Sequence, residues 1–351
     1  MGAPVPHRSR PQDRARGLLG LLNFGPERHW TVFVSDFALA QSDLRRVRRH
    51  VANAPTRLLF ARVDALQRQL QTAGVDLERD YVSLQVIVSN FESIGRVREL
   101  FTALPHADMA RLDLPFAGTR FRRSFATHAL QVVMDADYSE QDRISDRFFH
   151  HLEKKVPYRV VVRTRHGGEL VISDDVPWFH LAGRMEEGES RALPGGEVAY
   201  TGDRIDGDFT VDGALLPSPE EPAAGGTAAR LAALSKHLDR TPLRLIIRDG
   251  RMVRFEGDPK VAEPLTALFT GDERYGQVTE VGISFNRACR RFIHEWPAAS
   301  NEGRPGVHVA IGADPDRRHG TPMRRAPLVH IDLMAATSAV WVNDTRFLQT
   351  S

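Results

Sequence analysis

The sequence is short of cysteine: Cys289 is the only one among 351 residues. A single thiol forms no internal disulfide and no Cys-x-x-Cys site for zinc or redox chemistry. Because disulfides belong to oxidising compartments, this scarcity favours a cytoplasmic protein. No apolar run approaches the roughly 20 residues of a membrane span. The run from Gly17 to Phe24 follows an arginine-rich start but lacks the cleavage site of a signal peptide. We therefore expect no membrane association.

An excess of charge of one sign is also missing. Lys and Arg number 47 against 45 Asp and Glu, a formal net charge of +2, which does not indicate a nucleic-acid partner. The basic clusters Arg8 to Arg16 and Arg45 to Arg49 are interpreted as solvated. Nucleotide-binding glycine loops and the Gly-x-Ser-x-Gly nucleophile turn are absent. His294 and Glu295 begin like a zinc-protease helix, but Pro297 follows where that helix would continue.

What remains is ordinary globular composition, with 42% hydrophobic and 26% charged residues, in a chain long enough for about two domains. We predict a basic, flexible tail over residues 1–28, an α/β domain over 29–155 and a mostly β domain over 156–351. In the α/β domain, short runs of branched residues alternate with helical spacing, which favours a βα-repeat layer with parallel pairing. The predicted strands are Thr31–Val34, Arg57–Phe60, Tyr81–Val88 and Leu130–Met134, and the predicted helices Ser42–Ala54, Asp64–Ala73, Phe91–Leu104 and Ser139–Lys155.

After residue 155 the chain consists mainly of short strands and turns. A hairpin is predicted around His166-Gly167-Gly168, and another around Asp249-Gly250. Pro217 to Thr227 is predicted to be a loop or an insertion. The second domain is therefore expected to be a twisted sheet or barrel-like. Further strands are predicted at Val198–Tyr200, Asp208–Val211, Leu243–Ile247, Met252–Phe255, Val307–Ile311, Val329–Leu333 and Ala339–Val342.

Five acidic and histidine residues of this second domain are candidates for a metal site. Glu197 and Glu280 are each compatible with a solvated acid, and His308 with a core histidine, when taken singly. His330 and Asp332 stand two apart in an apolar strand, so their side chains project from the same face. Imidazole and carboxylate together suit zinc, cobalt, manganese or ferrous iron. Five such groups, each beside a short strand or a Gly-rich turn, favour the metal interpretation.

Several sequence motifs between about residues 143 and 345, in their order and their residues, resemble the thermophilic metalloprotease, or aminopeptidase T-like, family of dinuclear metal aminopeptidases. The resemblance implies that Glu197, Glu280, His308, His330 and Asp332 bind two ions of zinc, cobalt or manganese. It also implies a homodimer that cleaves short peptides from their N-terminus. The blocks are Leu152–Lys155, Gly168–Val171, Leu193–Val198, Arg248–Arg251, Glu280–Asn286, Gly306–Gly312 and His330–Asp332.

In that reading Glu280 is the general base that takes a proton from the metal-bound water. The family's tyrosine is missing from the segment after His308, so His319 or Arg317 is the candidate donor to the oxyanion. Phe285, Trp178 and Trp341 are expected in the core, with pocket walls as the second possibility.

Two other functions stay open. A mononuclear ferrous ring-cleaving dioxygenase of the same fold would use His308, His330 and Asp332 as its ligands, with a small-molecule substrate. A catalytically impaired relative would bind a peptide in a biosynthetic pathway, an interpretation motivated by the missing tyrosine.

Overall fold

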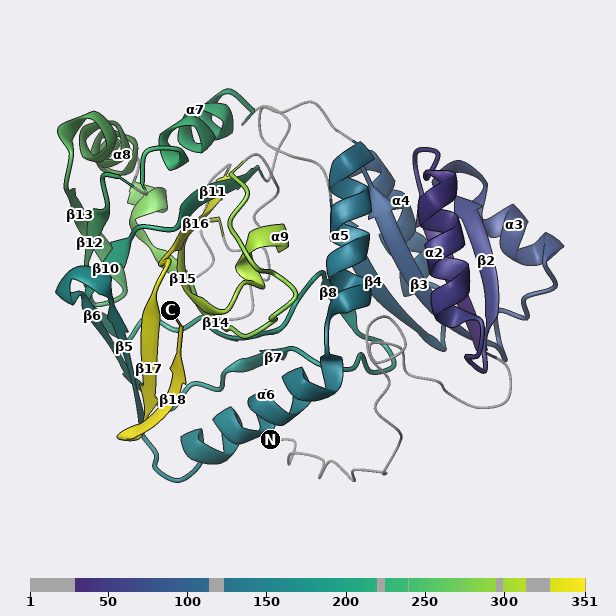
Figure 1. Ribbon diagram of the computed structural model, residues 1–351, viewed down its shortest axis with the longest axis horizontal. Helices are drawn as coiled ribbons and strands as arrows, with labels where there is room; N and C mark the ends of the chain where they lie inside the picture. Colours follow the sequence, from purple (N-terminus) through teal and green to yellow (C-terminus); the bar gives the residue numbers. More distant parts are fainter. Residues whose placement is uncertain are drawn as a thin grey trace.

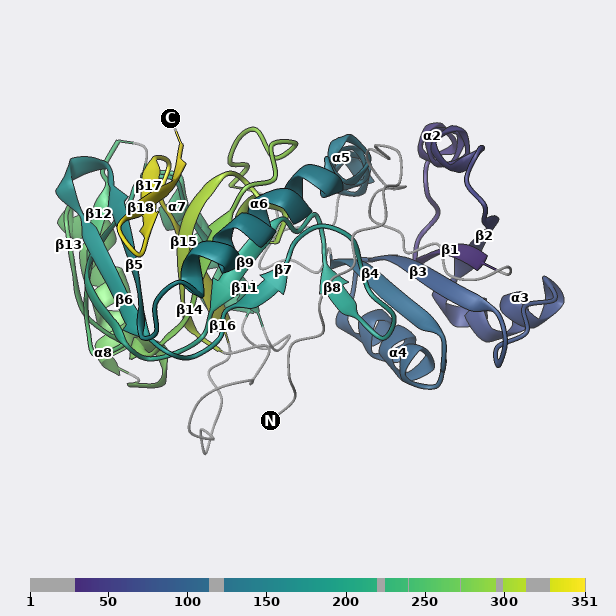
Figure 2. The same cartoon turned by 90° about the horizontal axis from the view of Figure 1, so that it is seen from below.

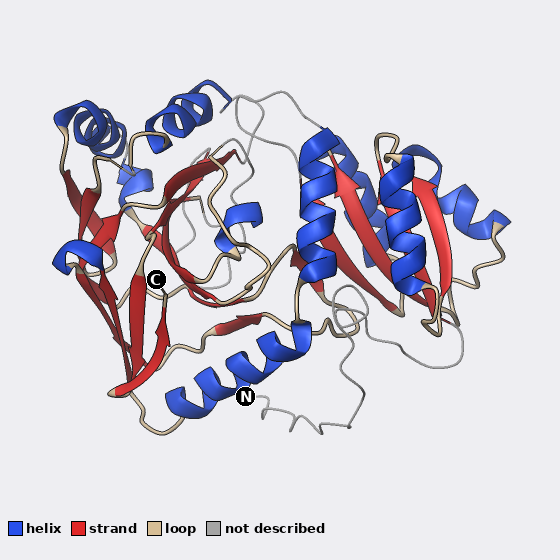
Figure 3. Cartoon of the chain, in the orientation of Figure 1, coloured by secondary structure: helices blue, strands red, loops and turns tan. Residues whose placement is uncertain are grey.

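The computed structural model describes residues 29–113, 123–219, 225–238, 240–271, 273–294, 299–313 and 329–350. Figure 1 shows two lobes side by side, an α/β lobe and a larger, mainly β lobe; α5 lies on the α/β lobe, and α6 runs along the lower edge of the β lobe. Figure 3 shows the same division by element type, with helices on both faces of the smaller sheet. The predicted tail, residues 1–28, lies outside the described residues. No described helix combines the length and the apolar character needed to cross a bilayer.

The smaller lobe is built on a five-stranded sheet in the order β2-β1-β3-β4-β8, and every neighbouring pair is parallel. Two helices cover one face and two cover the other (Figure 2), and a separate apolar cluster fills each interface. The strands are β1 (His29–Ser35), β2 (Arg57–Arg62), β3 (Tyr81–Val88), β4 (Ala107–Asp113) and β8 (Ser190–Ala192); the helices are α2 (Gln41–Val51) and α5 (Arg123–Asp135) on one face, α3 (Leu66–Thr72) and α4 (Phe91–Thr102) on the other.

Two features of this lobe differ from the sequence prediction. The predicted strand Leu130–Met134 lies inside α5, because Ala126, Leu130 and Val133 recur at helical spacing and are all buried. A short apolar run cannot be assigned to strand or helix by periodicity alone. The strand β4 was not predicted, and β8 comes from beyond residue 155, so the later part of the chain also contributes to this sheet.

The larger lobe stacks two antiparallel sheets, with strand orders β13-β12-β10-β6-β5-β17-β18 and β11-β16-β15-β14-β9-β7. Their facing sides form one apolar core. Both sheets are open, so the described strands form no closed barrel. The prediction of an α/β fold agrees with the structure, but a barrel-like second domain is not seen among the described strands. The strands are β5 (Tyr158–Thr164), β6 (Glu169–Asp174), β7 (Phe179–Leu181), β9 (Glu197–Tyr200), β10 (Ile205–Val211), β11 (Ala214–Pro219), β12 (Leu243–Arg248), β13 (Arg251–Glu256), β14 (Val278–Ser284), β15 (Gly306–Gly312), β16 (Val329–Met334), β17 (Ser338–Val342) and β18 (Thr345–Gln349).

The described parts of the segment predicted as a loop at Pro217–Thr227 are strand and helix, and residues 220–224 lie outside the described residues. Pro217 and Pro219 belong to β11, which pairs with β16 at the edge of its sheet. An edge strand tolerates proline because one row of its backbone N–H groups has no ladder partner. The helix α7 (Gly225–Ser235) then begins within the predicted loop. The remaining helical segments are α6 (Tyr138–Leu152), α8 (Pro259–Gly271), α9 (Ala299–Glu302), η1 (Val63–Ala65), η2 (Arg165–Gly167) and η4 (Glu273–Gly276).

Helix α6 connects the lobes. Asp137 caps its N-terminus by accepting a hydrogen bond from the backbone of Glu140 at 3.0 Å. Its fully buried Phe148 contacts Trp178 and Phe347 edge-on, with ring centroids 4.9 and 5.2 Å apart. Trp178 is therefore a core residue.

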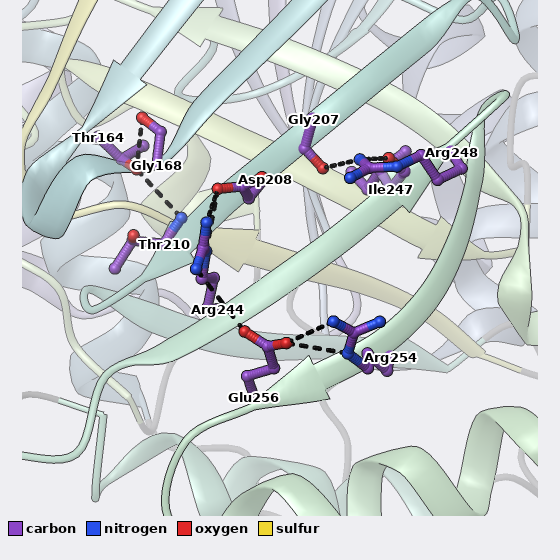
Figure 4. Close-up of polar contacts among 10 residues, drawn as sticks. All are labelled: Thr164, Gly168, Gly207, Asp208, Thr210, Arg244, Ile247, Arg248, Arg254 and Glu256. Carbon is purple, nitrogen blue, oxygen red and sulfur yellow. Dashed lines mark hydrogen bonds and ion pairs between the residues drawn. The ribbon is translucent and has the colours of Figure 1, made fainter.

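The outer face of the seven-stranded sheet carries a charged ladder across β10, β12 and β13 (Figure 4). Arg244 pairs with Asp208 and lies 3.7 Å from Glu256, which in turn accepts from Arg254 at 2.7 Å. Exposed pairs of this kind contribute little to stability, so we assign this face no functional role.

Candidate metal centre

The strands of the six-stranded sheet have one apolar and one polar face. Val281, Val309 and Ile331 are fully buried in the core against the other sheet. Their neighbours alternate onto the opposite face, because successive side chains of a strand point to opposite sides. The residues on that second face, from β9, β14, β15 and β16, are Glu197, Glu280, His308, His330 and Asp332.

Glu197, Glu280 and His308 form a compact cluster whose potential ligand atoms all lie within 4.8 Å of one another. The Nε2 atom of His308 is 3.8 Å from Glu197 Oε2 and 3.6 Å from Glu280 Oε1. Ser284 donates a hydrogen bond to Glu197 Oε2 at 3.1 Å, which fixes that carboxylate. Among the described residues, no atom forms a hydrogen bond of acceptable geometry with Nε2 of the buried His308. Such an atom, facing two carboxylates, suits a cation between them.

His330 and Asp332 form a second part of the same face. His330 Nδ1 lies 2.6 Å from the carbonyl oxygen of Ala313, which can only accept, so Nδ1 carries a proton. Nε2 then faces Asp332 Oδ1 at 3.2 Å, and this oxygen is also an acceptor. With Asp332 ionised, the contact is favourable if the ring is an imidazolium or if both atoms share a cation. Asp332 is fully buried, and Glu302 is a further neighbour of its carboxylate.

The buried charges shift one another's pKa values. Burial raises the pKa of Glu197 to about 7, with Glu280 adding to the rise and His308 opposing it. Burial would lower the pKa of both histidines, but the neighbouring carboxylates outweigh it and raise His308 to about 9 and His330 to about 10. Without a metal ion, protons therefore neutralise this face at neutral pH, and a divalent cation would replace them.

Glu302 is a sixth residue of this centre, and it was not among the predicted ligands. It ends the short helix α9, which Asn301 ties to the preceding loop by accepting from the backbone of Ile293 at 2.7 Å. Burial, with the charges of Asp332, Glu197 and Glu280, raises the pKa of Glu302 well above its ordinary value. In the sequence, Glu302 is an acidic residue shortly before the strand of His308. It does not belong to that strand, so the alternation of side chains along the strand does not predict where its carboxylate lies.

The turn before Glu197 is held by Asn286. The side-chain amide of Asn286 donates to the carbonyl oxygens of Pro194 and Gly195, both at 3.2 Å. Gly196 has a φ of +103°, and a Cβ there would lie 2.6 Å from Cβ of Asn286, so only glycine fits. The two sequence blocks Leu193–Val198 and Glu280–Asn286 are thus one structural unit that sets Glu197 opposite Ser284.

All five predicted ligands therefore lie on one face, and three have their ligand atoms in one cluster; their role as ligands stays a prediction. His319 and Arg317 lie outside the described residues. Phe285, like Trp178, belongs to the core. Trp341 lies beneath Arg163, whose Cζ is 4.8 Å from the ring centroid. None of these three aromatic residues is needed to explain the metal centre.

Comparison with known proteins finds a family model and solved structures that this chain resembles. Residues 190–319 match the model of the family described as crocagin biosynthetic protein CgnE/B. The fold is similar to the solved structure of 2,5-dihydroxypyridine dioxygenase from Pseudomonas putida KT2440, with a TM-score of 0.54 and 12% identity, over 91% of this chain and 89% of that chain. No curated protein matches the chain.

These findings correct the family assignment made from the sequence. Residues 190–319 match a biosynthetic family, and the chain has a dioxygenase as a structural neighbour, so the aminopeptidase T-like assignment and the identification as a metalloprotease hydrolase are wrong. The blocks that carried that resemblance encode a glycine turn and close strand packing, which the fold needs whatever its chemistry. The protein thus has a fold similar to that of 2,5-dihydroxypyridine dioxygenase, and its residues 190–319 match the model of a family of biosynthetic proteins.

Proposed function

We propose that this protein is a metal-dependent enzyme of a biosynthetic pathway that oxidises a small molecule at a divalent ion held by Glu197, Glu280 and His308. The observation that carries the proposal is the cluster of these three side chains, in which His308 Nε2 lies 3.8 and 3.6 Å from two carboxylates and forms no hydrogen bond of acceptable geometry with the described residues. The biosynthetic context comes from the family match, and the oxidative chemistry from the dioxygenase neighbour.

The donor set fits a divalent ion of intermediate hardness, such as ferrous iron, manganese or zinc. A bound ion of this kind would supply Lewis acidity, and ferrous iron would also activate dioxygen toward the substrate, which provides the electrons for the oxidation. The chain's own part is to hold and orient the ligands: Ser284 fixes Glu197, and Ala313 fixes the tautomer of His330. Glu302, with its raised pKa, keeps a proton beside Asp332.

The ligand set differs from that expected of a one-iron dioxygenase. That set would be His308, His330 and Asp332, but His330 and Asp332 are hydrogen-bonded to each other, and the compact cluster contains two glutamates instead. We therefore propose a carboxylate-rich site, to which His330 and Asp332 add ligands or neutralising charge.

A metal-free binding protein of a biosynthetic pathway is the second candidate. The direct His330–Asp332 contact favours it, because an imidazolium there satisfies the carboxylate without any ion. Such a protein would bind a peptide or an intermediate and catalyse no reaction.

Elemental analysis of untagged protein, before and after anaerobic incubation with Fe²⁺ or Mn²⁺, distinguishes the metal-dependent enzyme from the metal-free binding protein. We expect at least one equivalent of metal in the natural protein and its loss in a Glu280→Gln, His308→Ala variant. The control is His106→Ala, which removes a half-exposed histidine paired with Glu187 in the other lobe. Oxygen uptake with 2,5-dihydroxypyridine is the first activity assay. Absence of metal after reconstitution contradicts the enzyme proposal and leaves the binding protein.

A further inference from the structure

A basic surface covers the end of the smaller lobe that lies away from the β lobe, where α2 packs on the edge strand β2 (Figure 1). Residues 41–63, which span both elements, contain six arginines and one acidic residue, although the whole chain has a formal net charge of only +2. The acidic residue, Asp43, is buried and accepts a hydrogen bond from Thr127 at 2.7 Å. The outer side of α2 is therefore cationic, without an exposed acid in either element.

The basic surface is formed by four exposed arginines, and none of them forms an ion pair with an acidic group of the described residues. Cζ of Arg48 lies 5.3 Å from the ring centroid of Phe60, and Arg57 stacks in the same way on Trp30 at 5.4 Å. Stacking holds a guanidinium in place and leaves its N–H groups available to an anion. The four residues are Arg45, Arg48, Arg49 and Arg57.

The positive charges of α2 also repel one another. Arg45 lies three residues before Arg48 and four before Arg49, and side chains at these spacings are neighbours on the surface of a helix. This run was interpreted from the sequence as solvated. Water screens the repulsion only in part, whereas an anionic partner would replace it by attraction.

The second component of this surface is the open edge of β2. This strand ends its sheet, so one of its sides has no neighbouring strand among the described residues. Alternate residues of an edge strand turn their N–H and C=O groups away from the sheet. The N–H of Arg62 donates to Oε1 of Gln69 at 2.8 Å, which places Leu58 and Phe60 in the same outward row. Within the described part of the chain, no backbone hydrogen bond from outside the sheet reaches Leu58 or Phe60, and both are only partly buried.

We propose that this basic surface is a docking site for an extended, acidic segment of a partner protein, which adds to the open edge of β2 as a further strand. Alternate side chains of the added strand point to the face that α2 covers, where carboxylates meet the arginines. Main-chain hydrogen bonds supply affinity, and the charges select an acidic segment. The inference goes beyond the proposed function, because this surface belongs to the smaller lobe and shares no residue with the metal centre.

Other polyanions fit the surface less well. A lipid bilayer takes up the apolar side of a surface helix, but Val47 and Val51 of α2 are buried within the lobe. A nucleic acid pairs with arginines but has no strand backbone to match the outward row of Leu58 and Phe60. A polypeptide uses both the charges and the strand edge.

The test measures binding of a fluorescein-labelled peptide of Glu-Val repeats to the full-length protein by fluorescence anisotropy, at about 150 mM NaCl to screen distant charges. The variant Arg45→Glu, Arg49→Glu should bind this peptide about tenfold more weakly, because it reverses two charges that face the carboxylates. The matched control is Arg159→Glu, Arg165→Glu, which reverses two exposed arginines of the β lobe and should keep the natural affinity. Thermal unfolding checks that each variant folds, and Arg45→Gln, Arg49→Gln replaces the first variant if it does not.

Two further peptides separate the charge from the strand edge. A peptide of Gln-Val repeats lacks the charge, and a Glu-Val peptide with N-methylated valines keeps the charge but lacks N–H groups for strand pairing. Each should bind the natural protein about tenfold more weakly than the parent peptide.

Several outcomes would overturn the inference. No binding of the parent peptide, or equal binding by the natural protein and the Arg45→Glu, Arg49→Glu variant, rules out the docking site. Equal binding of the N-methylated peptide rules out strand addition. Tighter binding of a short DNA duplex or of phosphatidylserine vesicles, lost in the same variant, replaces the polypeptide by another polyanion. None of these results bears on the metal centre, which the metal analysis tests separately.

Discussion

The imidazole of His308 lies directly against the backbone of Gly282 on the neighbouring strand. The two residues are paired across β14 and β15, and a Cβ at position 282 would lie 2.0 Å from Cε1 and 2.3 Å from Nε2 of the ring. Real Cβ atoms do not approach this closely, so the orientation of His308 toward Glu197 and Glu280 depends on the absence of a side chain at this position.

The change Gly282→Ala should therefore displace His308 and weaken metal binding by about 10- to 100-fold, as losses of supporting residues around metal ligands do. The free energy of unfolding should fall by about 1–3 kcal/mol because of overpacking. Metal titration and chemical denaturation measure the two effects. Gly95→Ala is the control, since a Cβ there meets nothing within 4 Å. Unchanged metal affinity in Gly282→Ala would show that His308 is not a ligand.

Asn286→Ala should destabilise the protein by about 1–3 kcal/mol, because it leaves the carbonyl oxygens of Pro194 and Gly195 without their donor. Asn286→Asp keeps the size but replaces the donating amide with an acceptor, so it should be at least as damaging. Chemical denaturation of both variants is the measurement. A stable Asn286→Asp would mean that shape, and not hydrogen bonding, holds the turn before Glu197.

The sequence predicted the parts of this centre that lie in regular strands. His330 and Asp332 are two apart in an apolar run, and strand alternation is enough to set them on one face. Glu302 was missed because its position depends on α9 and on Asn301, which no local pattern reveals. Leu130 to Met134 was misassigned because a buried helix and a buried strand present the same apolar run. The wrong enzyme class has a similar origin, because the motifs specify the turn and the packing around Glu197 but not the reaction.

The smaller lobe offers a test of pH dependence independent of the metal. Asp108 is fully buried, accepts from Ser83 at 2.8 Å and Tyr81 at 2.9 Å, and burial raises its pKa to about 7. A raised folded-state pKa means that the folded protein favours the protonated acid. Stability is therefore lost as the pH rises from the unfolded value near 4 to about 7. Asp108→Asn should remove this loss and raise the free energy of unfolding at pH 8 by about 1–4 kcal/mol.

Chemical denaturation at pH 5, 6, 7 and 8 measures that difference, with Asp64→Asn, a change at an exposed side chain, as the control. An identical pH profile in Asp108→Asn and the natural protein would contradict the raised pKa of Asp108.

Metal binding should itself depend on pH, with a sign set by the two histidines. The pKa values of about 9 for His308 and about 10 for His330 mean that both carry protons at neutral pH in the metal-free protein. A metal ion must displace these protons, so apparent affinity should rise with pH, by about tenfold per unit for each proton released. Titration with Mn²⁺ at pH 6, 7 and 8 measures the slope. Saturation with Mn²⁺ should also stabilise the fold. At 100 times its dissociation constant, Mn²⁺ should raise the free energy of unfolding by about 2.7 kcal/mol, and Glu280→Gln should reduce this gain. A pH-independent affinity would contradict binding at this centre, whose histidines must release protons to the solvent when an ion binds.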